Sequence, residues 1–188
     1  MRILADLPST VHYSDGLTTR TAVAHPSSGV ATIEFDAPRP WVVAATATTA
    51  EAGPLGCSIE VDGRNVANSQ PTDQFIMCLA TEGLLNVPRP KGRHEIEMTS
   101  TRVKGGGGWE AYATAGGAYS RSSGASNPNS SSIGHTRAEE ADGPVRLVSV
   151  QTEQGGKSSC LIRIDGAKVA YSTTRARGEI ATCSAMIH

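Results

Sequence analysis

The chain has 188 residues, of which 38% are hydrophobic, so it can bury a core as one large domain or two small ones. Its 17 basic and 18 acidic residues give a formal net charge of −1 and form no basic cluster, which argues against nucleic acid or an anionic membrane as a partner. No run of about 18 apolar residues occurs, so we expect neither membrane insertion nor a signal peptide.

The composition favours short β-strands joined by turns, because aromatic residues make up only 4% of the chain while glycine occurs 20 times. Segments in which apolar and polar residues alternate, or in which β-branched residues gather, predict the strands. In chain order these segments are 29–35, 41–49, 57–61, 64–67, 74–79, 94–103, 145–152, 160–164, 167–171 and 179–185. Asp62-Gly63 and Asp165-Gly166 are each typical of a two-residue hairpin turn.

These elements predict an all-β fold. We expect a jelly-roll or immunoglobulin-like sandwich over residues 1–104, a Gly/Ser-rich crossing segment over 105–143, and a smaller β-unit over 144–188 that repeats the hairpin. The last unit is too short to enclose a core alone, so it should pack on the first unit or on another chain.

The crossing segment combines glycine and serine tracts with three large aromatic residues, Trp109, Tyr112 and Tyr119. Its composition is that of a flexible linker, because it carries too little apolar surface to offset the entropy of ordering. Exposed aromatic rings in such a tract indicate contacts with a neighbouring subunit. We therefore expect these three residues to be interface residues of an oligomer.

Four cysteines occur in two similar units, Cys57 with Cys78 and Cys160 with Cys183. The separations are 78 − 57 = 21 and 183 − 160 = 23 residues, which lack the close pairs of a structural zinc site. Equivalent positions in the two units favour two disulfides, each joining adjacent strands, over four buried thiols. The redox compartment decides between these alternatives.

No residue pattern indicates catalysis, a cofactor or a metal. The five histidines are scattered without ligand spacing, and Gly105–Gly108 lacks the lysine and the helix start of a phosphate loop. Asp62 and Asp165 provide one carboxylate per turn, whereas calcium takes 6 to 8 oxygen ligands. We therefore expect no enzymatic activity and no cofactor.

Four segments resemble, in their order, the strands of jelly-roll modules in bacteriophage tail and capsid surface proteins, which are similar to C1q/TNF-like heads. The segments are Val30–Pro38, Trp41–Ala47, Ile59–Gly63 and Pro90–Met98. The resemblance implies a structural virion protein, such as a minor tail protein, that is made in the host cytoplasm and assembles with copies of itself and other virion proteins.

The two cysteine units also resemble the periplasmic β-domain of mycobacterial MmpS-type proteins, in which a Cys-strand-Asp-Gly segment precedes a later cysteine. That resemblance implies an envelope accessory domain, but the membrane anchor of that family is missing from this sequence. A further alternative is a module that binds carbohydrate or the host envelope, with a host-surface glycan as its ligand.

Overall fold

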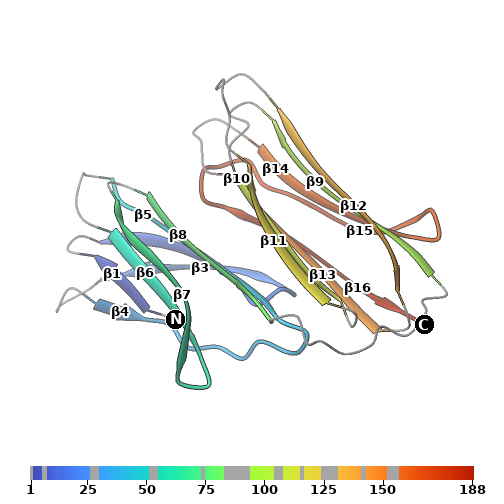
Figure 1. Ribbon diagram of the computed structural model, residues 1–188. Helices are drawn as coiled ribbons and strands as arrows, with labels where there is room; N and C mark the ends of the chain where they lie inside the picture. Colours follow the sequence, from blue (N-terminus) through green and yellow to red (C-terminus); the bar gives the residue numbers. More distant parts are fainter. Residues whose placement is uncertain are drawn as a thin grey trace.

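The computed structural model describes residues 2–5, 8–25, 30–50, 55–72, 75–82, 94–103, 108–114, 117–123, 131–140, 143–151 and 157–188. Every regular element within these ranges is a β-strand, which confirms the all-β fold class (Figure 1). No helix long and apolar enough to cross a membrane occurs among the described residues.

The first eight strands form a sandwich of two four-stranded antiparallel sheets. Sheet A has the strand order β4-β1-β6-β7, and sheet B has the order β3-β2-β5-β8. The strands are β1 (Arg2–Ala5), β2 (Ser9–Ser14), β3 (Thr19–Ala24), β4 (Val30–Thr32), β5 (Val42–Thr48), β6 (Leu55–Val61), β7 (Arg64–Thr72) and β8 (Phe75–Thr81).

The remaining eight strands form a second sandwich with the same topology. Sheet C has the order β12-β9-β14-β15 and sheet D the order β11-β10-β13-β16, so each strand number equals its counterpart in the first sandwich plus eight. The strands are β9 (His94–Val103), β10 (Gly108–Thr114), β11 (Gly117–Ser123), β12 (Ser132–Glu140), β13 (Gly143–Gln151), β14 (Lys157–Ile164), β15 (Ala167–Thr173) and β16 (Ile180–Ile187). The chain is therefore a tandem repeat of one eight-stranded unit.

The side chains of the two repeats correspond as well as the strands. Both Asp-Gly turns have positive φ at both residues, Asp62 at 49° and Gly63 at 75°, Asp165 at 50° and Gly166 at 79°. This backbone matches the right-handed twist of the strands that it joins, which is why the Asp-Gly pair marks both hairpins.

Both predicted disulfides are present, Cys57–Cys78 and Cys160–Cys183. Each bond connects the two facing sheets of a sandwich, so the prediction that it joins adjacent strands is wrong. Cys57 lies on β6 in sheet A and Cys78 on β8 in sheet B, and β14 and β16 repeat this arrangement. Closing loops of this length stabilises each sandwich by roughly 3 kcal/mol.

The four sheets stack in the order A, B, D, C, with an apolar layer between each neighbouring pair (Figure 1). Alternate residues of β5 face opposite ways: Val43 and Ala45 lie in the core of the first sandwich, and Val42 and Ala44 lie in the layer between the sandwiches. We call this third layer the middle layer. It explains why β5 is buried on both faces.

The two sandwiches meet through equivalent faces. Strand β5 packs against its counterpart β13, β8 packs against β10 and β11, and β16 packs against β2 and β3. Exchanging each strand for its counterpart leaves these contacts unchanged, which is the contact pattern of a two-fold symmetric dimer. The contact between β5 and β10 is an additional one outside this pattern. The fold therefore has the architecture of a homodimer joined into one chain.

The observed strand pairing differs from the boundaries expected from the sequence. Strand β9 pairs with β12 and β14 and therefore belongs to the second sandwich, not to a first unit ending at residue 104. The segment expected to cross as a linker contains β10, β11 and β12, which lie in sheets C and D. The unit expected over 144–188 is therefore part of a complete sandwich.

Two glycines of this segment, Gly108 and Gly134, lie beside a buried ion pair. Arg102 and Glu110 are 1% and 6% exposed, and Arg102 Nη1 lies 3.4 Å from Glu110 Oε2. A Cβ atom at Gly108 would collide with the Arg102 side chain, and one at Gly134 would collide with the Glu110 carboxylate. Glycine at these two positions makes room for the charges inside the second sandwich.

Candidate functional site

The connection between β4 and β5 distinguishes the two repeats. In the first sandwich it is nine residues long, Ile33 to Trp41, whereas two residues separate β12 from β13 in the second. We call residues 33–41 the pocket loop. Its apolar side chains Ile33, Phe35 and Ala37 pack against the core of the first sandwich.

The pocket loop and the β6–β7 hairpin enclose a cavity of about 480 Å³ in the first sandwich. Trp41, Val43 and Ile59, all buried, provide much of its apolar wall. The other lining residues are Phe35, Asp36, Ala37, Pro38, Arg39, Glu60, Val61 and Asp62. The cavity thus combines an apolar wall with several carboxylates, which is typical of a small-molecule site.

The second sandwich fixes the backbone of the pocket loop. Arg146, on β13, donates from Nη1 to the carbonyl oxygens of Pro38 and Pro40, and from Nη2 to that of Arg39 at 3.4 Å. The Phe35 ring lies 5.3 Å from the Tyr13 ring, which anchors the start of the loop on strand β2. The loop is therefore held from both sides.

Arg146 is 4% exposed, and its Nε has no hydrogen-bond partner among the described residues. Burial lowers the pKa of its guanidinium from the ordinary value, and the negative charges of Asp15 and Glu82 oppose this shift. Leu147 on β13 pairs with Cys183, and Ala45 on β5 pairs with Cys78, so these two residues are equivalent in the two repeats. Arg146 therefore occupies the position that Ala44 has in the first repeat. A small residue in one repeat is thus a buried cation in the other.

Glu82 links the end of β8 to the pocket loop. Its carboxylate lies 3.3 Å from Arg39 Nη1 and accepts a hydrogen bond from the Trp41 backbone N–H at 3.2 Å. Glu82 therefore fixes both the Arg39 side chain and the backbone at Trp41, two residues of the cavity lining.

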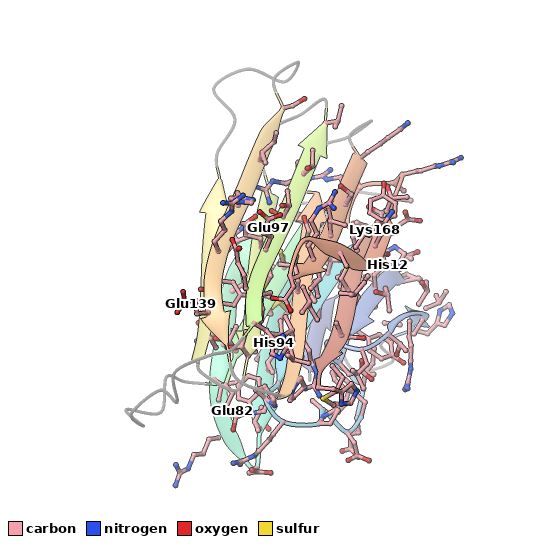
Figure 2. All side chains as sticks on the ribbon, turned by 90° about the vertical axis from the view of Figure 1, so that its right-hand side faces the viewer. His12, Glu82, His94, Glu97, Glu139 and Lys168 are labelled. Atoms are coloured by element: carbon pink, nitrogen blue, oxygen red, sulfur yellow. A yellow bond between two sulfur atoms is a disulfide. The ribbon has the colours of Figure 1, made fainter. Side chains whose placement is uncertain are left out.

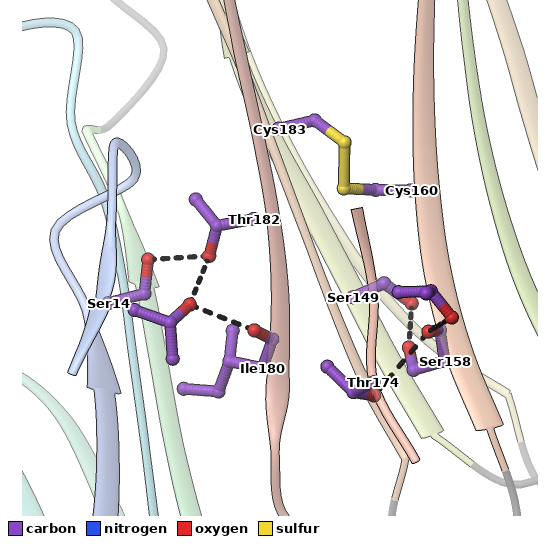
Figure 3. The surroundings of a disulfide bond; sticks show 10 residues. Ser14, Ser149, Ser158, Cys160, Thr174, Ile180, Thr182 and Cys183 are labelled. Atoms are coloured by element: carbon purple, nitrogen blue, oxygen red, sulfur yellow. Dashed lines mark hydrogen bonds between the residues drawn. A yellow bond between two sulfur atoms is a disulfide. The ribbon is translucent and has the colours of Figure 1, made fainter. Parts of the chain in front are cut away.

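Polar contacts orient the two sandwiches at one end of the middle layer (Figure 3). The hydroxyl groups of Ser14 and Thr182 lie 2.9 Å apart, and Thr19 donates to the Ile180 carbonyl oxygen at 2.8 Å. Thr46 donates to the Gly178 carbonyl oxygen at 2.5 Å. Beside these contacts, His12 and Glu179 line a smaller cavity of about 310 Å³.

Sheet C turns one broad face away from the rest of the molecule (Figure 2). The strand register places alternate residues of its four strands on this outer face. One half carries apolar and hydroxyl side chains: Thr99, Thr101, Val103, Ile133, Ser159, Leu161, Tyr171 and Thr173. Ile133 is 68% exposed and Tyr171 is 55% exposed, so this half presents apolar surface to solvent.

The other half of this outer face is charged. Arg137 pairs with Glu97 and, at 3.8 Å, with Glu95, while Arg163 lies 3.9 Å from Glu97. Figure 2 shows Glu97, Glu139 and Lys168 on this face. We call the whole outer face of sheet C, with both halves, the sheet C face.

The β14–β15 turn forms one border of the sheet C face. Asp165 Oδ2 lies 2.7 Å from His94 Nδ1, and Asp165 Oδ1 accepts a hydrogen bond from the Glu95 N–H at 2.9 Å. The bond from His94, followed by the backbone bond, lowers the pKa of the Asp165 carboxyl from its ordinary value. Asp165 thus fastens the hairpin to the start of β9.

The three predicted interface residues lie on β10 and β11, and Trp109 and Tyr112 face opposite sides of sheet D. Trp109 is 37% exposed, whereas Tyr112 is half-buried and packs on the core of the second sandwich. Tyr119 pairs with Tyr112 in the strand register, and its side chain lies outside the described part of the structure. Tyr112 therefore contributes to the core of the second sandwich, as Tyr13 does at the equivalent position of the first.

Sequence reasoning missed the pocket loop and Arg146. A signal was present, because Arg146 interrupts the apolar residues of the predicted strand 145–152. Among the described residues, no group of three or more His, Cys, Asp and Glu side chains is placed to hold a metal ion.

Comparisons with protein-family models, curated proteins and solved structures gave no match.

Proposed function

We propose that this protein is a non-enzymatic structural component of a phage virion, on the tail or the capsid surface, and that it acts by packing against other subunits. The observation that carries the proposal is the sheet C face, an open four-stranded surface with Ile133 68% exposed and Tyr171 55% exposed. Large apolar side chains exposed on an open face beside charged residues favour contact with another protein surface.

The rest of the molecule supports a mechanical role. Two disulfides join the sheets within each sandwich, and an apolar layer with buried hydrogen bonds joins the sandwiches to each other. Such a body presents the sheet C face without rearranging, so little conformational entropy is lost on association. The resemblance to phage jelly-roll modules stays a prediction, and it provides the virion setting.

Lysine cross-linking on purified particles tests this proposal. Lys157 and Lys168 lie at the border of the sheet C face, on β14 and β15. We expect the particles to contain this chain. We also expect Lys157 and Lys168 to be cross-linked to a second copy of the chain or to another virion protein. Particles that lack the chain, or that contain it with both lysines linked only within the chain, would contradict the proposal.

A second candidate is a module that binds a host-surface glycan or another envelope component, and the pocket under residues 33–41 favours it. Aromatic side chains and carboxylates in one cavity suit a polar ligand with apolar faces. A glycan array probed with the purified chain tests this alternative: selective binding that is lost in a Glu60→Gln variant supports it, and no retained glycan speaks against it.

A further inference from the structure

We propose that the sheet C face binds the sheet C face of a second copy of this chain, related to the first by a two-fold axis parallel to the strands. This inference rests on the proposed packing role, and it adds the identity of the partner and the way in which the two faces meet. Two features of the face carry it: the distribution of charge across its four strands, and the positions of its two most exposed large apolar side chains.

The charges of the sheet C face are divided unequally between its two sides. The outer residues of β12 and β9 include one guanidinium, Arg137, and three carboxylates, Glu95, Glu97 and Glu139. We call these two strands the acidic side.

The outer residues of β14 and β15 have the opposite balance, with the three cations Lys157, Arg163 and Lys168. One carboxylate, Asp165, lies in the turn between these strands, where the His94 ring and the Glu95 N–H bind it. We call these two strands the basic side. A face with this division of charge is complementary to a copy of itself that is turned so that its basic side covers the acidic side.

The charges at the two edges of the face are available to such a partner. Glu139 lies on the edge strand β12 and is exposed, and Lys168 lies on the edge strand β15 and is exposed. Neither forms an ion pair among the described residues. The ammonium group of Lys168 lies 4.3 Å from the centroid of the Tyr171 ring, on the same face.

A two-fold axis parallel to the strands matches charged and apolar groups at the same time. It reverses the order of the strands, so β12 of one copy lies over β15 of the other and β9 lies over β14. Ile133 then meets Tyr171 of the second copy, and Glu139 meets Lys168 of the second copy, each within one residue pair of the strand register. The axis does not move residues along the strands, so the apolar half of one face covers the apolar half of the other.

The middle layer already contains a contact of this kind. Sheets B and D stack there with their strand orders reversed, because β16 packs against β2 and β3 while β8 packs against β10 and β11. A second copy on the sheet C face would continue the stack A, B, D, C with C, D, B, A. The same fold thus provides a precedent for the proposed arrangement.

The size of the face fits a dimer that forms at high concentration. Four strands that lie about 4.8 Å apart, with the length of the ten-residue β9, cover roughly 600 Å². Two such faces bury about 1,200 Å² together, the lower limit for stable specific interfaces. We therefore expect association that increases with protein concentration.

Light scattering of two full-length charge variants, alone and mixed, tests the proposal. Glu139→Lys places cations at both edges of the face, and Lys168→Glu places carboxylates at both edges. We expect each variant alone to dimerise at least about ten-fold more weakly than the wild type, because symmetry places each substitution in the dimer twice and an exposed charge pair contributes up to about five-fold.

An equimolar mixture of the two variants should regain the dimer. In the mixed pair, the introduced lysine faces the introduced glutamate, and the remaining native Glu139 faces the remaining native Lys168. Arg64→Glu, at an exposed position on the equivalent hairpin of the first repeat, is the matched control and should associate as the wild type does. Equal thermal unfolding temperatures of all these proteins exclude lost folding as the cause of lost association.

The inference is overturned if both single variants associate as strongly as the wild type, or if their mixture forms no dimer. If Ile133→Lys prevents association in that case, the sheet C face still packs against a partner, in another arrangement, and the packing role stands. A single-chain mass of the wild type at every concentration also overturns the inference. Absence of the chain from purified particles, with a dimer in solution, would contradict only the virion role.

Discussion

The guanidinium of Arg146 lies between the two sandwiches and donates to three successive carbonyl groups of the pocket loop. Its counterpart in the first repeat is Ala44, so this contact breaks the symmetry between the repeats. A single side chain of the second sandwich thereby fixes the cavity of the first.

We predict that Arg146→Met lowers the free energy of unfolding by about 2 kcal/mol, because it leaves three partly buried carbonyl groups without this donor. Chemical denaturation of the full-length chain measures this change. Arg137→Met is the matched control, since Arg137 is 62% exposed at its side chain, and it should lower the free energy of unfolding by less than about 1 kcal/mol. Equal effects of the two substitutions would contradict the role given to Arg146.

His12 is a second residue whose chemistry depends on the contact between the sandwiches. Its Nδ1 lies 3.0 Å from the Thr21 hydroxyl, and it lines the smaller cavity together with Glu179. Burial lowers the pKa of His12 from its ordinary value, and the charge of Glu179 opposes the shift. The folded protein therefore favours the neutral imidazole.

Because the unfolded chain takes up this proton more readily, the contribution of His12 to stability is lost as the pH falls from about 7 toward the lowered pKa. We predict that His12→Gln reduces the fall in the free energy of unfolding between about pH 7 and pH 5. Urea denaturation at several pH values measures this difference. His25→Gln, at an exposed position, should keep the wild-type dependence of the free energy of unfolding on pH. If His12→Gln keeps the same dependence, the role given to His12 is wrong.

At the scale of single residues, the sequence predicted the cysteine pairs and both Asp-Gly turns, because these depend on local geometry or on a repeated pattern. It did not predict Arg146 or the carboxylates of the pocket. Asp36 and Glu60 are 24 residues apart in the chain and line one cavity only because of the tertiary fold.

The two Asp-Gly hairpins are the elements in which the repeats agree most closely. Gly63 and Gly166 have φ values of 75° and 79°, and a Cβ atom at either position would meet nothing within 4 Å. The requirement for glycine therefore comes from the backbone alone.

We predict that Gly63→Ala and Gly166→Ala each lower the free energy of unfolding by about 1 kcal/mol, the cost of the left-handed conformation for a residue with a Cβ atom. Thermal denaturation of the two variants checks this value. Asp62→Asn should be neutral, because asparagine tolerates positive φ. A loss well above the predicted value would show that the hairpins have neighbours that this structure does not show.

Strands were predictable where β-branched residues alternate with polar ones, as in β9 and β14. Strands β1 to β3 and β10 to β12 were missed, and β3, β10 and β11 among them consist largely of Ser, Thr, Ala and Gly. Their pairing supplies the stability that their composition does not: β10 lies between β11 and β13 in a continuous antiparallel register.

At the scale of the whole molecule, the two sandwiches form one body with four layers. Val148 is fully buried in the middle layer, together with Val42 and Ala44 of the first sandwich. Because the sandwiches share this layer, we expect the wild-type chain to unfold in one cooperative transition.

We predict that Val148→Asp separates this transition into two, because an unpaired charge in the middle layer removes the favourable contact while each sandwich keeps its own core and disulfide. Scanning calorimetry distinguishes one transition from two. Val66→Asp, at a position 41% exposed on the first hairpin, should keep a single transition. Two transitions in the wild-type chain would refute the coupling between the sandwiches.

The tandem arrangement was visible in the sequence only at the two cysteine units, because the other strands have diverged in composition while their order stayed the same. Strand order and sheet stacking depend on contacts between residues far apart in the chain. The alternation of residues along a single strand does not depend on those contacts, so the sequence predicted a smaller unit in place of the second sandwich.

The most direct test of the proposed packing role is light scattering of the purified chain over a range of concentrations, for the wild type and for Ile133→Lys. Ile133 is the most exposed large apolar residue described on the sheet C face, at 68%, and Val66→Lys on the first sandwich is the control. The proposal predicts that the wild type and Val66→Lys associate as concentration rises while Ile133→Lys keeps the mass of one chain. A single-chain mass for all three proteins, or equal association of all three, would contradict packing through the sheet C face.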